Sequence, residues 1–460
     1  MSAPDSRPQP VLDRRRAGVL LHPTALAGEG ALGAAGRRFI DWLAEAGFSV
    51  WQVLPLGPVG PDGSPYWVHA DSALNPLLID RHEAADPAQA PQQFAMFCAA
   101  QAQWLEDYVL FEALAAAQGT AAWRSWPPAL RDREPGSLAA ARAQLADELQ
   151  RLRIEQWQAD MQWQQMRAHA HMRGVRLFGD LPIYVAPDSV STWSQRVQFQ
   201  LDAAGQPRAV AGVPPDYFSA DGQLWGNPLY DWEQARRDGF AFWRARLGVQ
   251  LQRFDLVRID HFRALAAYWA VPADAATARD GHWRPAPGRE LLQALQRQYG
   301  EVPLVAEDLG LITPDVDELR REFRLPGMRV LQFGFDGSPD NPHLPHNLQR
   351  DTVLYTGTHD NDTTLGWYRS LPPAIVAHVD AYLRSEAQAM PRSLCAAALA
   401  SVAQLAILPL QDLLALDSRA RFNTPGTVSG NWQWRAQPQD CSAALAAELR
   451  ALNRLYGRLC

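Results

Sequence analysis

Near its middle the chain reads Asp255-Leu-Val-Arg-Ile-Asp260-His-Phe-Arg263, a short apolar run that ends in a carboxylate. Two later segments repeat this pattern, and they read Leu304-Val-Ala-Glu307-Asp308-Leu-Gly310 and Val353-Leu-Tyr-Thr-Gly-Thr-His359-Asp360-Asn361-Asp362. Largely apolar runs of this length are typical of parallel strands that are buried on both faces. The C-terminal ends of the strands of a barrel converge on one mouth, so we expect the three acids to meet there.

Outward from these segments, similar runs recur along the chain and alternate with helical patterns. The eight runs are Gly18–Leu21, Val50–Leu54, Val175–Phe178, Leu256–Ile259, Leu304–Ala306, Val330–Phe333, Val353–Thr356 and Gln404–Leu408. Eight is the number of strands that a closed barrel of this type requires. The sequence therefore predicts an α/β protein, a (β/α)8 TIM barrel with helical and loop-rich insertions between strands.

Two long segments interrupt the alternation. The first contains three predicted helices, Gln92–Ala117, Ser137–Ile154 and Glu155–Met172. On the first helix, Trp104, Tyr108 and Phe111 form an apolar stripe at helical spacing, which is typical of core packing. The second segment is rich in Gly, Pro, Asp and aromatic residues without clear periodicity, as in long functional loops. We expect the barrel to begin in residues 1–80, a helical insertion at 81–173, and the remaining barrel at 174–460 with a loop insertion at 186–231.

The composition excludes several classes of protein. Of the 460 residues, 47% are hydrophobic and 20% are charged, which is the profile of a globular protein with a large core. A net charge of −7 argues against general affinity for nucleic acid or anionic membranes. All 43 basic residues are Arg, and the absence of Lys excludes a Schiff-base mechanism or a lysine-dependent phosphate loop.

The cysteines and the N-terminal region bear on location. The four cysteines are scattered without a CxxC pair: Cys98, Cys395, Cys441 and Cys460. This spacing argues against a disulfide framework or a zinc site. The residues Arg14–Arg16 precede an apolar run, but His22 and Pro23 end that run too early for a signal peptide. No stretch reaches the roughly 20 apolar residues of a membrane span. We expect a cytoplasmic protein with no cofactor and no metal.

Paired carboxylates suit glycoside chemistry, in which one acts as nucleophile and the other as general acid and then base. An acid after a strand can instead cap the next helix or pair with Arg. Arg258 lies two residues before Asp260, so both side chains should point to the same face of the strand. A cation at that position keeps a carboxylate ionised for attack.

These strand ends closely resemble the catalytic strand ends of amylomaltase-type 4-α-glucanotransferases (glycoside hydrolase family 77), which are relatives of the α-amylases. The resemblance extends in collinear order over nearly the whole chain. Its further blocks are Trp51-Gln-Val-Leu-Pro-Leu-Gly-Pro58, Gly179-Asp-Leu-Pro-Ile-Tyr184, Gly212-Val-Pro-Pro-Asp-Tyr-Phe-Ser219, Trp225-Gly-Asn-Pro228 and Asn423-Thr-Pro-Gly426.

The resemblance implies a role for each matching residue. It makes Asp260 the nucleophile, Glu307 the general acid/base and Asp360 the carboxylate that stabilises the transition state. Glu307 must hold a proton near neutral pH, so its site should favour the neutral form. The implied substrate-binding residues are Tyr66, Arg258, His359, Asp216, Tyr217, Phe218, Gln223 and Trp225. The implied partners are malto-oligosaccharides and α-1,4-glucans.

The sequence departs from the family pattern on the donor side. Ser64-Pro65-Tyr66 matches the motif in which the Tyr stacks on a sugar ring. The family usually continues with Gln and a Ser-Ala-Phe-Ala-Gly-Asn-Pro-like stretch, whereas this chain reads Trp67-Val-His-Ala-Asp71-Ser-Ala-Leu-Asn75-Pro76. The difference bears on donor preference and leaves the three acids in place.

Two alternatives compete with a transferase. The first is an α-glucan hydrolase of the α-amylase type, but such enzymes commonly hold calcium through Asp and Asn clusters, and no convincing cluster is found here. The second is an inactive barrel that only binds glucan, which loss of Asp260, Glu307 or Asp360 would have indicated. The sequence therefore predicts a retaining 4-α-glucanotransferase.

Overall fold

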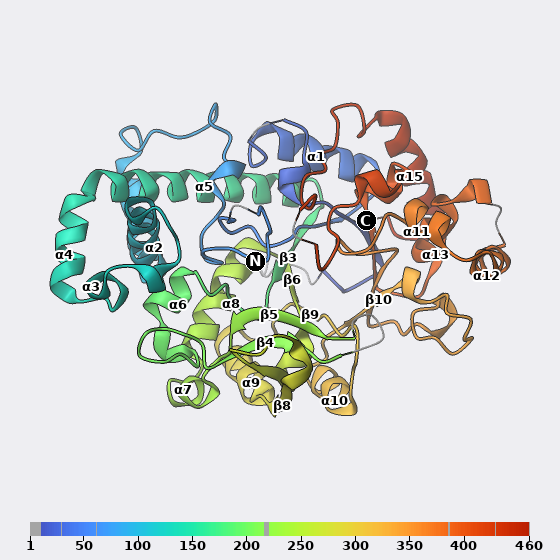
Figure 1. Ribbon diagram of the computed structural model, residues 1–460. Coiled ribbons are helices and arrows are strands. Elements are labelled where there is room, and N and C mark those ends of the chain that lie inside the picture. Colours follow the sequence, from blue (N-terminus) through green and yellow to red (C-terminus); the bar gives the residue numbers. More distant parts are fainter. Residues whose placement is uncertain are drawn as a thin grey trace, which may run out of the picture.

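Eight parallel strands close into a barrel in the computed structural model, which describes residues 11–28, 30–60, 62–215, 220–384, 387–427 and 429–459 (Figure 1). Around the barrel the strand order is β1-β12-β11-β10-β9-β6-β3-β2, and the first and last strands pair with Arg16 opposite Leu405. The strands are β1 (Arg16–Leu20), β2 (Val50–Gln52), β3 (Arg176–Leu181), β6 (Leu256–Ile259), β9 (Leu304–Ala306), β10 (Gly327–Val330), β11 (Thr352–Tyr355) and β12 (Leu405–Pro409). The predicted fold class is confirmed.

All eight predicted runs overlap a barrel strand, but one is misplaced. The run Val330–Phe333 shares only Val330 with β10, and Leu331–Phe333 forms a 3-10 turn. Leu331 in that turn is as fully buried as Val330 in the strand. Apolar character therefore could not mark where the strand ends.

The barrel strands are buried because helices cover their outer face. For example, α8 contacts β3 and β6, and α13 contacts β12. Strands β1 and β12 approach so closely that a Cβ on Gly18 would lie 2.6 Å from the Ile407 side chain. The helices of the barrel and its C-terminal part are α1 (Ala34–Glu45), α8 (Ala241–Arg253), α9 (Gly288–Tyr299), α10 (Pro314–Glu322), α11 (Thr364–Ser370), α12 (Pro373–Leu383), α13 (Arg392–Ala400), α14 (Leu410–Leu413) and α15 (Ala443–Leu455).

A helical segment projects from the barrel on the left of Figure 1. It consists of α2 (Pro91–Gln118), α3 (Pro128–Arg131), α4 (Pro135–Gln144) and α5 (Ala146–Met172). Its separate core includes Tyr108 and Phe111, and Trp104 packs against it, as the predicted stripe required. The predicted helix boundary between Ile154 and Glu155 is wrong: the break lies at Leu145, and α5 runs through both residues. Nothing at 154–155 breaks a helix, whereas α5 begins with Asp147 and Glu148 near its positive end.

Residues 186–231 are more regular than predicted. They contain α6 (Val190–Ser194) and two strands, β4 (Ala209–Val213) and β5 (Gln223–Pro228); α7 (Trp232–Arg237) follows. The strands belong to a four-stranded antiparallel sheet of order β5-β4-β7-β8, whose other members are β7 (Ala267–Pro272) and β8 (His282–Pro285). Half of the sheet thus comes from beyond β6, so no pattern within 186–231 alone could reveal it.

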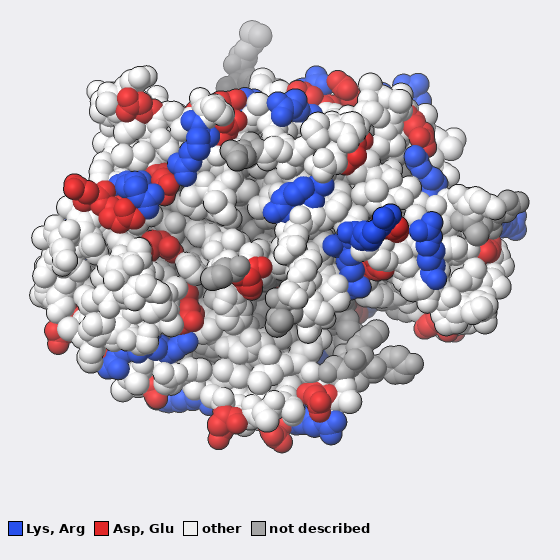
Figure 2. Space-filling view, turned by 45° about the horizontal axis from the view of Figure 1, so that its top comes forward, with Lys and Arg blue, Asp and Glu red and all other residues white. Residues whose placement is uncertain are grey.

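On the face seen in Figure 2 the surface is hollowed near its centre, and acidic and basic side chains are interspersed around the hollow. None of the described helices is long and apolar enough to cross a membrane.

Candidate active site

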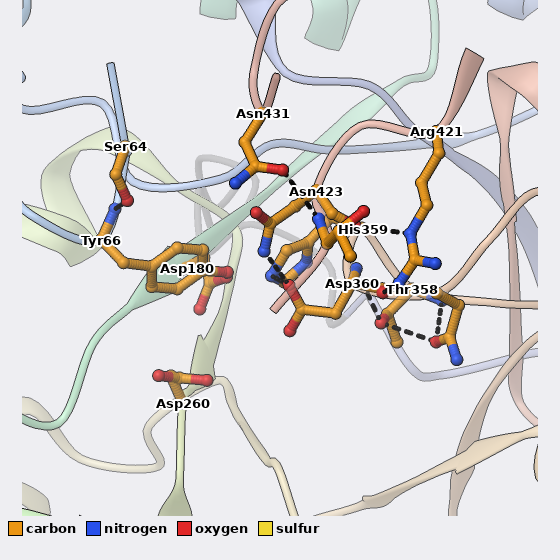
Figure 3. A network of polar contacts seen from close by, with 12 residues as sticks. Ser64, Tyr66, Asp180, Asp260, Thr358, His359, Asp360, Arg421, Asn423 and Asn431 are labelled. Carbon is orange, nitrogen blue, oxygen red and sulfur yellow. Dashed lines mark hydrogen bonds and ion pairs between the residues drawn. The ribbon is translucent and has the colours of Figure 1, made fainter. Parts of the chain in front are cut away.

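The three predicted acids all lie at the C-terminal ends of barrel strands. Asp260 directly follows β6, Glu307 directly follows β9, and Asp360 lies in the loop after β11. The backbone N–H of His261, the residue after Asp260, donates a 2.7 Å hydrogen bond to Glu307 Oε2. Figure 3 shows Asp260, Asp360 and Tyr66 around one space at this end of the barrel. The barrel therefore brings together acids that are far apart in the sequence.

Arg258 connects Asp260 to a second, fully buried carboxylate. Its guanidinium lies 2.8 Å from Asp260 Oδ1 and donates to both oxygens of Asp180 at 2.8 and 2.9 Å. Burial alone would lower the pKa of Arg258, but Asp180 and Asp260 outweigh it, so that pKa is raised. Arg258 is thus a permanent cation that holds Asp260, whose side chain is 29% exposed, toward the open cleft.

Glu307 has a different environment from Asp260. Its side chain accepts backbone hydrogen bonds from His261 at 2.7 Å and from Leu309 at 2.9 Å. Burial raises the pKa of Glu307 to about 7; Arg258 opposes this shift and the charge of Asp260 adds to it. A carboxyl group with this pKa can both give and take a proton near neutral pH.

The turn after Asp260 makes this arrangement possible. His261 adopts a left-handed backbone conformation with φ of 50°, which is uncommon for residues other than glycine and which directs its N–H toward Glu307. Burial lowers the pKa of the His261 side chain to about 4, so its ring is neutral near pH 7. Glu307 therefore does not face a second positive charge in addition to that of Arg258.

Asp360 is held by groups from the segment after β12. Asn423 donates a 2.6 Å hydrogen bond to Asp360 Oδ1, and Arg421 donates to the Asp360 carbonyl at 2.7 Å (Figure 3). His359 Nε2 lies 3.3 Å from the same Oδ1. The Asp360 side chain is 46% exposed, so it faces the cleft while its backbone and one oxygen are fixed.

A wall of aromatic rings borders the acids. Tyr66 stacks on His359 with ring centroids 5.0 Å apart, and Trp432 lies within 6.2 Å of both rings. The Tyr66 hydroxyl donates to Asp180 at 2.6 Å, which fixes the ring beside Asp260. Flat apolar rings with a fixed polar edge suit the binding of sugar rings.

Gln223 and Trp225 both lie on β5. The Trp225 ring meets the His261 ring edge-on at 4.7 Å, and its indole N–H donates to Gln223 at 3.1 Å. The antiparallel sheet therefore brings Trp225 next to the residue that follows Asp260. Three other predicted substrate-binding residues, Asp216, Tyr217 and Phe218, lie outside the described residues.

The segment after Tyr66, which departs from the family pattern, contacts the surrounding helices. Asp71 forms a buried ion pair with Arg246 of α8, and His69 lies 3.0 Å from Glu112 of α2. These partners anchor the altered residues to the protein around the cleft.

Three residues of the site were not predicted from the sequence: Asp180, Asn423 and Trp432. Asp180 lies near the end of β3, so the rule that selected the other acids also applied to it. Asn423 and Trp432 come from the loop after β12, and only the fold shows that this loop contacts Asp360 and Tyr66. Among the described residues, no group of three or more His, Cys, Asp or Glu side chains could hold a metal ion.

The sequence and the fold are similar to those of known proteins. A family model described as 4-alpha-glucanotransferase (glycoside hydrolase family 77) matches residues 21–90 and 80–441. The chain is 46% identical to the 4-alpha-glucanotransferase of Thermus thermophilus, over 97% of this chain and 99% of the relative. It is 39% identical to the chloroplastic/amyloplastic 4-alpha-glucanotransferase of Solanum tuberosum, over 97% of this chain and 87% of the relative.

A solved structure of the amylomaltase from Streptococcus agalactiae in complex with acarbose superimposes with a TM-score of 0.93 at 32% identity. The match covers 97% of this chain and 100% of that one. The resemblance noted in the sequence is confirmed, and so is the enzymatic activity that it implies.

Proposed function

Because the chain belongs to the 4-alpha-glucanotransferase family, we propose that Asp260, Glu307 and Asp360 transfer α-1,4-glucan segments between malto-oligosaccharides by a retaining double displacement. Action on α-glucans follows from the family. The assignment of steps to these residues rests on the contrast between Asp260, which is ion-paired and open to the cleft, and Glu307, which is buried with a pKa near 7. Two carboxyl groups in such different environments are suited to different roles.

In the first step, Asp260 Oδ attacks the anomeric carbon of an α-1,4-linked glucose, and the bond to the departing glycosidic oxygen breaks. Glu307 gives its proton to that oxygen, so the leaving chain departs as an alcohol. Arg258 holds the Asp260 carboxylate in position for attack through an ion pair of 2.8 Å. Asp360, held by Asn423, stabilises the positive charge that develops on the sugar ring.

In the second step, an acceptor attacks the β-glucosyl ester on Asp260, and Glu307 takes the acceptor's proton. A sugar 4-hydroxyl as acceptor gives transfer, whereas water gives hydrolysis. We propose that Trp225 and Gln223, with Asp216, Tyr217 and Phe218, which precede them in the sequence, bind the acceptor. Tyr66 and His359 bind the donor. The choice of transfer then depends on water exclusion and on acceptor binding at Trp225.

The proposal is tested by incubating the protein with maltotriose and following the products by chromatography. We expect longer malto-oligosaccharides together with free glucose. Asp260→Asn should lower the rate by roughly a thousandfold or more. Asp255→Asn is the matched control, because Asp255 is also paired with an arginine, Arg167 at 3.2 Å, and lies at the opposite end of the same strand. Glucose and maltose without longer products would support the hydrolase instead, and a fully active Asp260→Asn would refute the assigned nucleophile.

A cytoplasmic location, expected from the scattered cysteines, stays a prediction. Of the cysteines that the structure describes, Cys98, Cys395 and Cys441 are unpaired. The proposed location would be checked by cell fractionation.

A further inference from the structure

The loop that carries His359 and Asp360 is held at both ends by a single carboxylate that lies outside the cleft. This loop begins at Thr356, directly after β11, and ends at Thr364, the first residue of α11. Both threonines are completely buried. Both direct their hydroxyl groups at Asp412 of the short helix α14, which follows β12.

The contacts of Asp412 are short and satisfy both of its oxygens. Oδ2 accepts hydrogen bonds from Thr356 Oγ1 at 2.6 Å and from Thr364 Oγ1 at 2.7 Å. Oδ1 accepts the backbone N–H of Thr364 at 2.7 Å. One side chain therefore fixes the distance between the first and last residues of the loop.

The burial of the Asp412 carboxylate costs free energy of folding. Asp412 is 1% exposed, and burial raises its pKa while the three donors oppose the shift. Its neighbours Leu410 and Leu413 are apolar and equally buried, so Asp412 places a carboxylate in an otherwise apolar environment. Buried carboxylates of this kind are strongly destabilising unless their hydrogen bonds are complete.

The segment after Asp412 holds the same loop at further points. Ser418 donates to Asp362 at 2.6 Å, while Arg421 and Asn423 contact the backbone and side chain of Asp360 (Figure 3). Asp412 is the only one of these anchors that contacts both ends of the loop among the hydrogen bonds described.

We propose that Asp412 is a positioning residue for glucan transfer: by tying Thr356 to Thr364 it sets where Asp360 and His359 stand relative to Asp260 and Glu307. This inference rests on the proposed role of Asp360. A displacement of about 1 Å in a reacting group can cost on the order of a hundredfold in rate. The described hydrogen bonds of Asp412 go to Thr356 and Thr364 and not to the cleft acids, so it acts through the loop.

The test is a double-mutant cycle with the full-length protein and maltotriose. Asp412→Asn keeps the size of the side chain but places an amide N–H2 group against hydrogen-bond donors. We expect kcat to fall roughly ten- to hundredfold and KM to change less than about threefold. In an Asp360→Asn background the same substitution should lower kcat by less than about threefold, because the group that Asp412 positions is already disabled. An equal fold-loss in both backgrounds would overturn the proposal.

Asp255→Asn is the matched control for stability. Asp255 is a buried acid that accepts a backbone N–H from Leu177 and contacts His171, each at 2.9 Å, at the opposite end of the barrel. The Asp255→Asn variant should have a lower melting temperature, as Asp412→Asn should, while its kcat stays within about twofold of the wild-type value. A comparable kcat loss in Asp255→Asn would mean that destabilisation alone explains the effect, and the proposal would fail.

If Asp412→Asn does not fold, Thr356→Val and Thr364→Val, each of which removes one hydroxyl donor, replace it in the cycle under the same criterion. Failure of the proposed function has a separate signature, since Asp360→Asn alone would then retain wild-type kcat.

Discussion

Replacing Glu307 by Gln should make the folded protein more stable relative to wild type as the pH rises from 4.5 to 7, while abolishing transfer. In the folded protein burial raises the pKa of Glu307 from 4.5 to about 7. Between these two values the folded state holds a proton that the unfolded chain has lost. Stability from Glu307 is therefore fully present below pH 4.5, declines as the pH rises, and is lost above about pH 7.

The size of the effect follows from the shift. Each pKa unit corresponds to about 1.4 kcal/mol, so the raised pKa costs the wild-type protein about 3 kcal/mol above pH 7. Gln carries no such penalty. It also places an N–H2 group against one of the backbone donors of His261 and Leu309, which adds a constant cost at every pH. Only the pH-dependent part of the difference is therefore diagnostic.

The assay is urea unfolding of wild type and Glu307→Gln from pH 4.5 to pH 8. We expect the free energy of unfolding of the variant to gain on that of wild type by about 3 kcal/mol across this range and to level off above pH 7. Ionisable groups that do not interact with Glu307 are common to both proteins and cancel in the difference. A difference that stays constant with pH would show that Glu307 is ionised in the folded protein and would refute its assignment as a proton donor.

Three further predictions concern activity. The rate of glycosyl transfer should fall as the pH rises through about 7, because Glu307 loses the proton that it must donate to the leaving oxygen. Initial rates measured from pH 5 to 9 check this, and a rate that rises over that range would contradict it. Asn423→Ala removes the 2.6 Å hydrogen bond to Asp360 and should lower kcat roughly ten- to hundredfold with little change in KM, as steady-state kinetics would show. Trp225→Ala should raise the ratio of hydrolysis to transfer about fivefold, because the acceptor loses a stacking partner beside His261; product chromatography measures that ratio, and an unchanged ratio would place the acceptor elsewhere.

The barrel could be predicted because each of its strands is buried on both faces, and such strands show as apolar runs in a single sequence. Apolar runs do not locate a strand correctly where a buried residue lies outside it, as Leu331 does. They also fail where pairing is non-local, since β4 and β5 depend on β7 and β8 from beyond the next barrel strand. The presence of helices in the insertion could be predicted, whereas the boundary between α4 and α5 at Leu145 could not.

The site shows the same division. The three acids followed from their positions after strands, and Arg258 from its spacing to Asp260, which it contacts at 2.8 Å. The roles of Asn423, Trp432 and Asp412 depend on contacts between the last barrel segment and a loop that precedes it by 48 residues or more. Such contacts leave no periodic trace, so only the folded chain reveals them.

The pairing of β1 with β12 has a consequence for biosynthesis. The barrel cannot close until the strand at Leu405–Pro409 has left the ribosome, so β1 keeps an unpaired edge during most of translation. Contacts this distant in sequence form slowly, and open strand edges are sites of aggregation. A nascent chain that stalls anywhere before β12 would present two such edges, one on β1 and one on the last strand made. Expression yield should therefore depend on how quickly the message between β1 and β12 is translated, and on chaperones that shield those edges until the barrel is closed.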